Sequence, residues 1–271
     1  MKKYILVIAL ILGGIGIVNS QTIKKLSAKG SHAQFTDDSN VLLLSKSDYS
    51  TLEKYDIKSN KQSLINKGRG IAYNCYVSGE DVFVKNRANN MISKIDINTG
   101  IKKELLTDKS PKFVAEKKKL GKKAIKVAVD VVLTERIDGF IVLYSDGTSN
   151  EFSPRGKNTY VNVELSPNGK KVLYTGVNGS EVLSLENNTI LPLGLFEATK
   201  WMDNDNIIYM STKDNGDYIT ESDVYIFNIS KRTNTNLTED FDDLAMYPSA
   251  SKDGKLVLFN NNENEVFLIE L

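Results

Sequence analysis

Few side chains in this sequence of 271 residues could do covalent or metal chemistry. His32 is the only histidine and Cys75 the only cysteine. A nucleophilic triad with a histidine base therefore has one possible base, and no Gly-x-Ser-x-Gly elbow accompanies it. Zinc sites need several Cys or His ligands, and no glycine motif for phosphates or dinucleotides is present. The sequence accordingly predicts no catalytic residue, no metal site and no cofactor.

Carboxylates are the remaining groups that could bind something small. They gather at 203–205, 214–217 and 239–243, and carboxylate and amide oxygens are the ligands that calcium prefers. None of these segments has the spacing of a calcium-binding loop, so we interpret them as hydrophilic turns. Two carboxylates of a glycosidase could still meet across the centre of a fold, which sequence spacing does not reveal.

A repeated segment indicates the fold that must position these groups. Residues 166–174 read SPNGKKVLY and residues 251–259 read SKDGKLVLF, and their turn glycines, Gly169 and Gly254, are 85 positions apart. That distance is two periods of roughly 42, which is typical of propeller blades with four strands each. Further turns before apolar strands occur at positions 39, 79 and 205.

These turns leave room for one more, irregular unit within 113–157, which makes six units. We therefore predict an all-β, six-bladed β-propeller with four-stranded antiparallel blades over residues 21–271. The last unit ends after its third strand, and residues 22–26 form a spare strand at the other end of the sequence. We predict that this N-terminal strand completes the last blade against 256–271, which removes an open sheet edge.

The same alignment predicts which residues surround the centre of the ring. One position on each innermost strand is apolar and should pack between blades: Phe35, Cys75, Leu165, Trp201 and Ala250. Its neighbour is polar and should face a central channel: Gln34, Asn74, Glu164, Lys200 and Ser249. Two residues earlier, on the same side, lie His32, Asn162 and Tyr247, with Ala72 and Ala198.

We favour the interpretation that these polar residues form a water-filled channel wall, as any propeller needs. The alternative hypothesis is a ligand site at one mouth of the channel, in which Glu164 and Lys200 could form a charge pair. We interpret Cys75 as a small buried hydrophobe and Trp201 as core.

The N-terminus reads as a secretory signal peptide. Lys2 and Lys3 precede an apolar segment over residues 4–18, and we predict cleavage after Ser20. An uncleaved anchor helix is the alternative. Cleavage would lower the formal charge from +1 to −1, which attracts neither nucleic acid nor an anionic membrane. With one cysteine, the exported chain would have no internal disulfide.

Several further expectations follow from this composition. No cysteine lies near the cleavage site, so no lipid anchor is expected, and no second apolar segment is long enough to span a membrane. We expect a monomer in the periplasm or secreted. Lysines gather at 117–126, and we interpret them as a solvated loop or edge strand rather than a patch for an acidic partner.

The two nine-residue segments resemble the repeats of TolB-type six-bladed, WD-like propellers. Residues 211–228, STKDNGDYITESDVYIFN, resemble that family's link between the second and third strands of a blade. The C-terminal part also resembles stand-alone exported propellers of Bacteroidetes-type bacteria, which have no assigned activity. The resemblance implies a periplasmic protein that binds other envelope proteins through its loops or channel mouth. Unlike TolB, this chain has no room for a separate N-terminal domain before the first blade.

The preferred function is therefore an exported, non-enzymatic propeller that binds an envelope or secreted protein. The alternative is a glycan- or small-ligand-binding protein, or an enzyme, that uses the polar channel. A propeller of prolyl-oligopeptidase type without its hydrolase domain is a third possibility.

Overall fold

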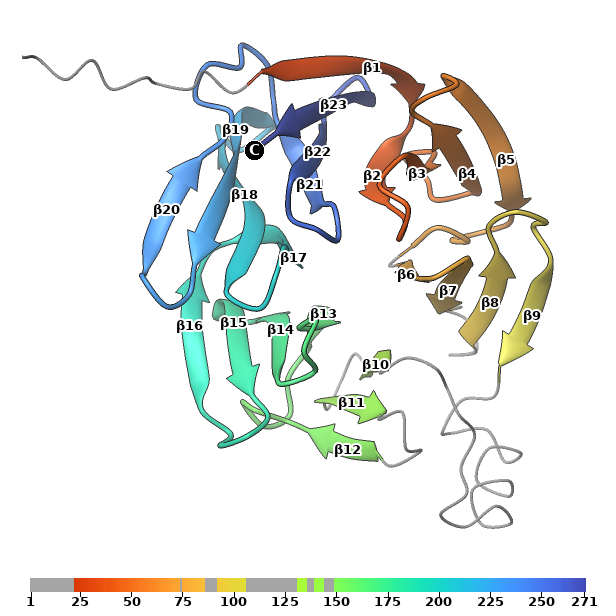
Figure 1. Cartoon of the computed structure of the whole chain (residues 1–271). Helices are drawn as coiled ribbons and strands as arrows, with labels where there is room; N and C mark the ends of the chain where they lie inside the picture. Colours follow the sequence, from red (N-terminus) through yellow and green to blue (C-terminus); the bar gives the residue numbers. More distant parts are fainter. Residues whose placement is uncertain (1–21, 74, 86–91, 106–130, 136–138, 144–148) are drawn as a thin grey trace, which may run out of the picture.

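The computed structural model describes residues 22–73, 75–85, 92–105, 131–135, 139–143 and 149–271. The described residues form strands and turns with no helix among them, so none of them forms a helix that could cross a membrane. The strands belong to sheets arranged side by side around a common centre, with the innermost strand of each sheet nearest that centre (Figure 1). This arrangement is a β-propeller.

Five of the sheets have four antiparallel strands each. The first consists of β2 (Ser31–Phe35), β3 (Val41–Ser45), β4 (Thr51–Asp56) and β5 (Lys61–Lys67). The second consists of β6 (Tyr76–Ser78), β7 (Asp81–Lys85), β8 (Ile92–Asp96) and β9 (Lys102–Leu105). The next two are β13 (Val161–Leu165), β14 (Lys171–Gly176), β15 (Gly179–Ser184) and β16 (Ile190–Gly194), followed by β17 (Glu197–Trp201), β18 (Asn206–Asp214), β19 (Ile219–Asn228) and β20 (Thr233–Asn236). The closing blade has the order β21 (Met246–Ala250), β22 (Leu256–Asn260), β23 (Glu265–Glu270) and β1 (Ile23–Lys29).

The predicted blade architecture is confirmed, but the predicted count of six four-stranded blades is not. The described residues contain five such blades and one three-stranded sheet, formed by β10 (Val131–Glu135), β11 (Gly139–Leu143) and β12 (Ser149–Phe152). This sheet lies within the irregular unit expected at 113–157. Much of that unit, including the lysines at 117–126, lies outside the described residues.

The predicted closure by the N-terminal strand is confirmed. β1 pairs antiparallel with β23, with Ile23 opposite Ile269 and Lys25 opposite Phe267. The strand is longer than expected, because it continues through a bulge to Lys29. On its outer side, the Lys25 ammonium lies 2.6 Å from the Glu265 carboxylate. The first and last strands of the described chain therefore complete one blade.

The two repeated nine-residue segments form the same turn with the same contacts. Gly169 and Gly254 have φ values of 70° and 68°, a left-handed conformation that glycine adopts without steric cost. The Ser166 hydroxyl accepts the Lys171 N–H at 2.9 Å, and the Ser251 hydroxyl accepts the Leu256 N–H at 3.0 Å. The shared Ser and Gly are therefore explained by turn geometry and backbone hydrogen bonding.

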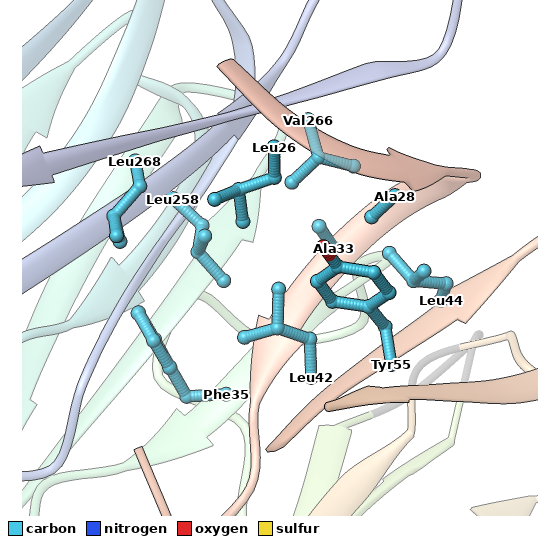
Figure 2. Packing of buried hydrophobic residues seen from close by; sticks show 10 residues of the cluster. All are labelled: Leu26, Ala28, Ala33, Phe35, Leu42, Leu44, Tyr55, Leu258, Val266 and Leu268. Carbon is cyan, nitrogen blue, oxygen red and sulfur yellow. The ribbon is translucent and has the colours of Figure 1, made fainter. Parts of the chain in front are cut away.

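Each hydrophobic core lies between neighbouring sheets. Figure 2 shows one such cluster, which joins the closing blade to the first blade. Its members are Leu26, Ala28, Ala33, Phe35, Leu42, Leu44, Tyr55, Leu258, Val266 and Leu268. Fully burying a leucine or phenylalanine side chain contributes about 1.5–3 kcal/mol, so the contact between blades is a main source of stability.

The apolar position predicted on each innermost strand belongs to these cores. Phe35, Cys75 and Trp201 are buried in three different clusters, and Leu165 and Ala250 pack against two others. Burial raises the pKa of the Cys75 thiol to about 12. Cys75 is therefore a buried thiol and Trp201 a core residue, as expected.

A buried ionic network joins β15 to the loop before β13. The Glu181 side chain is 3% exposed. It accepts the Tyr174 hydroxyl at 2.7 Å and, from the loop, Arg155 Nη2 at 2.6 Å and Arg155 Nε at 3.1 Å. Burial alone would raise the pKa of Glu181, but the bonds from Arg155 and Tyr174 outweigh burial and lower it. The carboxylate is therefore charged and fully paired.

Candidate functional site on one face of the ring

The antiparallel order of the strands determines which loops share a face of the ring. The innermost strand of each blade begins on one face, and the second strand returns to that face. The turns between second and third strands, and the links from one blade to the next, therefore lie on that same face. We call it the His32 face, because His32 is the second residue of β2.

Four innermost strands contain the same β-bulge near this face. In β2, Ser31 pairs with Ser45 and Gln34 with Leu43, so His32 and Ala33 together oppose Leu44. The register shifts in the same way in β13, β17 and β21. The first bulged residue has a positive φ in every case: 54° at His32, 51° at Asn162, 46° at Ala198 and 53° at Tyr247. The bulge breaks the simple alternation on which the sequence alignment of these side chains relied.

His32 lies within an aromatic cluster on this face. Its ring centroid lies 4.2 Å from that of Tyr247 and 4.6 Å from that of Tyr49, and the Tyr49 and Tyr73 centroids are 5.1 Å apart. The Tyr49 hydroxyl lies 2.8 Å from His32 Nε2. His32 Nδ1 is buried and has no hydrogen-bond partner among the residues that the structure describes. Burial, together with the charge of Lys200, lowers the pKa of His32 to about 4, so the imidazole is neutral at pH 7.

Behind His32 lies a cavity that offers about 10 Å³ to the centre of a water molecule. Its lining combines polar and apolar side chains from the first two blades: His32, Gln34, Leu43, Leu44, Ser45, Leu52, Ala72 and Cys75. The volume of this cavity is at the lower limit for one water.

Glu164 and Lys200 do not form the charge pair that we considered. The Glu164 carboxylate instead accepts the backbone N–H of Trp201 at 2.9 Å, and the Trp201 indole N–H donates to the Glu164 carbonyl at 3.1 Å. The carboxylate therefore joins two neighbouring blades through the backbone. Lys200 is half-buried and makes no ion pair within the part of the chain that the structure describes.

The predicted site residues are only partly brought together. His32 and Tyr247 are in contact, and Gln34 lines the same cavity as His32. Ser249 is half-buried and Asn162 is exposed, and neither has a contact to His32 that the structure shows. Asn74 lies outside the described residues. Tyr49 and Tyr73 are additional members that sequence reasoning missed. Tyr49 lies in the turn after β3, outside the aligned segments, and Tyr73 lies between the aligned Ala72 and Asn74 at a position that was not assigned to the channel.

Three exposed apolar side chains lie in loops of the His32 face on two adjoining blades. Val177 and Leu195 are 68% and 84% exposed, and Tyr218, at the tip of the β18–β19 hairpin, is 67% exposed. Within each blade, strands next to these loops are paired: Ser180 with Gly194 across β15 and β16, and the Thr212 hydroxyl donates to the Glu197 carboxylate at 2.9 Å. We call Val177, Leu195 and Tyr218 the apolar patch.

Carboxylates lie on the hairpin that carries Tyr218 and on its two flanking segments. The loop 237–245 is attached to β19 where the Ser222 hydroxyl donates to the Ala245 carbonyl at 2.6 Å. Exposed acidic residues of the hairpin and its two flanking segments are Glu197, Asp214, Asp217, Glu221, Glu239, Asp240, Asp242 and Asp243. Lys213 pairs with Glu221. Asp203 and Asp214 accept backbone N–H groups within their own turns, and among the described residues no three acidic, His or Cys side chains could together hold a metal.

On the opposite face, hydrogen bonds and an ion pair between turns connect neighbouring blades. Asp37 accepts the Gly79 N–H at 3.0 Å and pairs with Lys252 at 3.0 Å, which joins three blades. Asn204 accepts the Asn168 N–H at 2.9 Å in the same manner. Among the described residues, Ile101 is the exposed apolar side chain that lies in a turn on this face, at 68% exposure.

The charge of Lys200 leads to a prediction for Lys200→Met. The pKa of His32 should rise above about 4, because one of the two causes that lower it is removed, and should stay below 6.5 because burial remains. Since the folded pKa lies below the unfolded value of 6.5, wild-type protein should lose stability as the pH falls from 6.5 to about 4, by at most about 3 kcal/mol. The variant should lose less. NMR titration of the single histidine and urea unfolding measure both effects, and Lys213→Met, which should change neither, is the control.

The comparisons with known proteins concern the fold. No family model matches the chain, and no curated protein matches it. The Cps50 (Swd1) β-propeller domain of Myceliophteria thermophila is similar in structure, with 9% identity, a TM-score of 0.51 and coverage of 93% of this chain and 99% of that domain. TolB from Acinetobacter baumannii is similar with 13% identity, a TM-score of 0.40 and coverage of 93% of this chain and 55% of TolB, so the chain spans about half of its length. The likeness to the Cps50 domain supports a β-propeller fold.

Proposed function

We propose that this chain is an exported, non-enzymatic propeller that binds another protein of the cell envelope through its His32 face. The apolar patch is the observation that carries the proposal. Groups of exposed apolar side chains with a polar rim are typical of protein interaction sites. On the opposite face, polar groups of neighbouring turns bind one another through hydrogen bonds and an ion pair, so fewer of them are available to a partner protein. The resemblance of the repeats to TolB-type propellers supports the same function.

The charges around the patch indicate the chemistry of the partner. Eight exposed carboxylates lie on the hairpin and its flanking segments, and Lys213 compensates one of them. A partner surface with apolar side chains flanked by Lys or Arg would complement this arrangement. Such binding should weaken with added salt, because exposed charges are screened over about 10 Å at 0.1 M ionic strength.

Replacement of the patch tests this proposal. The triple variant Val177→Ser, Leu195→Ser, Tyr218→Ser should bind its partner at least 10-fold more weakly, because it loses the apolar contacts, and should unfold at the wild-type temperature, because all three side chains are exposed. Partners captured by crosslinking in envelope extract would be identified by mass spectrometry, purified and measured by titration.

The matched control is Ile101→Ser, which removes an equally exposed apolar side chain from the opposite face. It should retain full affinity. A purified partner that binds the triple variant as tightly as wild type, or whose binding is unaffected between 50 and 500 mM salt as the chosen test range, would refute the proposed surface.

The location is part of the proposal. We propose that residues 1–20 are a signal peptide, that the mature domain is 21–271 without a lipid anchor, and that the protein is monomeric in the periplasm or outside the cell. Mass spectrometry of the native protein should find an N-terminus at Gln21 in the extracytoplasmic fraction. An intact Met1 in the cytosol would contradict it. We further propose that the sheet β10–β12 is the sixth blade.

A further inference from the structure

The β18–β19 hairpin extends beyond the rest of its blade and leaves one edge of β18 open. β17 begins at Glu197, which lies opposite Met210, whereas β18 continues to Asp214 and pairs with β19 over that whole length. Among the described residues, no strand pairs with β18 on the β17 side from Ser211 to Asp214. Ser211, Lys213 and Asp214 are exposed, so this segment is a free sheet edge.

The alternation along β18 determines which main-chain groups face the open edge. The Asn206 carbonyl accepts a backbone N–H from the turn after β17 at 2.9 Å, so the even-numbered residues of β18 direct their N–H and C=O groups to that side. At the tip, the Asn215 N–H donates to the Tyr218 carbonyl at 3.3 Å, which makes the pairing of Asp214 with β19 one without hydrogen bonds. The main-chain groups of Thr212 and Asp214 therefore point away from β19, and no other described segment binds them.

The other edge of the hairpin is already covered by the loop 237–245. The Ser222 carbonyl accepts the Ala245 N–H at 2.9 Å, and the Val224 carbonyl accepts the Leu237 N–H at 2.8 Å. The Ser222 hydroxyl also donates to the Ala245 carbonyl at 2.6 Å. A further strand can therefore be added to this hairpin only along β18.

Side chains beside the open edge indicate what kind of strand it accepts. Thr212 and Asp214 lie on one face of β18, and the Thr212 hydroxyl donates to the Glu197 carboxylate at 2.9 Å. Glu197 and Asp214 are exposed, and neither carboxylate forms an ion pair with a residue that the structure describes. Lys213 pairs with Glu221 across the hairpin, so its charge does not keep another strand away. A basic side chain on an added strand would complement the two free carboxylates.

We propose that the open edge of β18, at residues 211–214, binds an extended segment of a partner protein as an added β-strand. This inference rests on the proposed function and specifies how the partner binds. Main-chain hydrogen bonds to Thr212 and Asp214 provide the pairing, and a Lys or Arg side chain of the segment lies beside Glu197 and Asp214. Leu195, which is 84% exposed and shortly precedes β17, offers an apolar contact at the end of the added strand.

Peptide selection tests the open edge without the natural partner. Random peptides selected on the immobilised protein should be rich in Val, Ile or Thr and should carry Lys or Arg. Thr212→Pro should weaken their binding roughly 10-fold or more, because proline has no N–H to donate, and the fold should tolerate it because proline is accepted at strand edges. Thr212→Val keeps the N–H and is the matched control, with wild-type affinity expected. Fluorescence anisotropy measures affinity, and circular dichroism measures the melting temperature.

Amide hydrogen exchange followed by NMR is a second test that needs no variant. In the free protein, the amides of Thr212 and Asp214 should exchange quickly, whereas the Lys213 amide, which faces β19, should exchange slowly. A saturating selected peptide should slow exchange at Thr212 and Asp214. The proposal would be overturned by protection of these two amides in the free protein, by unchanged exchange in the complex, or by a selection that yields no peptide dependent on the Thr212 N–H.

A purified partner separates this inference from the proposed function. A partner that binds the triple serine variant of the apolar patch weakly but binds Thr212→Pro as tightly as wild type would support the proposed surface and overturn strand addition. Selected peptides that depend on the Thr212 N–H, together with a partner that is indifferent to the triple serine variant, would support strand addition and refute the proposed surface.

Discussion

Deletion of residues 22–29 is expected to destabilise the protein by on the order of 5 kcal/mol or more, enough to unfold a typical domain. The deletion removes Leu26 and Ala28, which are 6% and 2% exposed, from the core between the closing and first blades. It also leaves the edge of β23 without its partner. Urea unfolding followed by circular dichroism, with light scattering for aggregation, measures the loss.

Two controls distinguish closure from a general effect of truncation. The double variant Lys24→Ser, Lys25→Ser keeps the strand and its buried residues and should be nearly as stable as wild type. A synthetic peptide of residues 22–30 should restore the stability of the truncated protein by supplying the missing strand. The same peptide with Leu26→Ser should not restore it. Unchanged stability after deletion would show that closure contributes nothing.

Glu181→Ala is expected to lower stability by about 2–4 kcal/mol, which corresponds to a melting temperature roughly 5–12 °C lower for a domain of this size. The substitution leaves the buried Tyr174 hydroxyl without its acceptor and opens a cavity between β14 and β15. Arg155 loses its carboxylate partner but can turn into solvent. Differential scanning calorimetry measures the change.

The pH dependence of Glu181→Gln identifies the charge as the cause. Because the pKa of Glu181 is lowered on folding from 4.5, its stabilisation is fully present above about pH 4.5 and is lost as the pH falls through the lower folded value. The difference between wild type and variant should therefore shrink in acid. Glu186→Ala, whose 63% exposed carboxylate pairs with Lys170, should show no measurable loss. A stability difference between wild type and Glu181→Gln that does not change with pH would show that packing alone causes the loss.

The features of the fold that the sequence predicts are those with local signatures. Gly169 and Gly254 mark turns because their left-handed φ favours glycine, and their spacing gives the blade period. The N-terminal strand could be matched to the closing blade because one strand was missing there. Leu26 and Ala28 face the core at alternate positions, as strand geometry requires.

The candidate site was less predictable because its geometry depends on the bulges. His32 and Ala198 have a left-handed backbone although neither is glycine, so the residue types at these positions do not indicate the change of register. Tyr49 reaches His32 from a turn whose position relative to β2 follows only from the folded blade. Glu181 looks like an ordinary solvent-facing strand residue, and only the loop that carries Arg155 explains its burial.

The pairing of β1 with β23 also determines when the fold can be completed. Lys25 and Glu265, which meet across these strands, are 240 positions apart in sequence. The pairing of β1 with β23 cannot form until both ends of the chain are present. Contacts between such distant segments slow folding, because a large loop must close before any stabilisation is gained. A chain that ends before its last blade has no β23, so β1 is left without its partner strand.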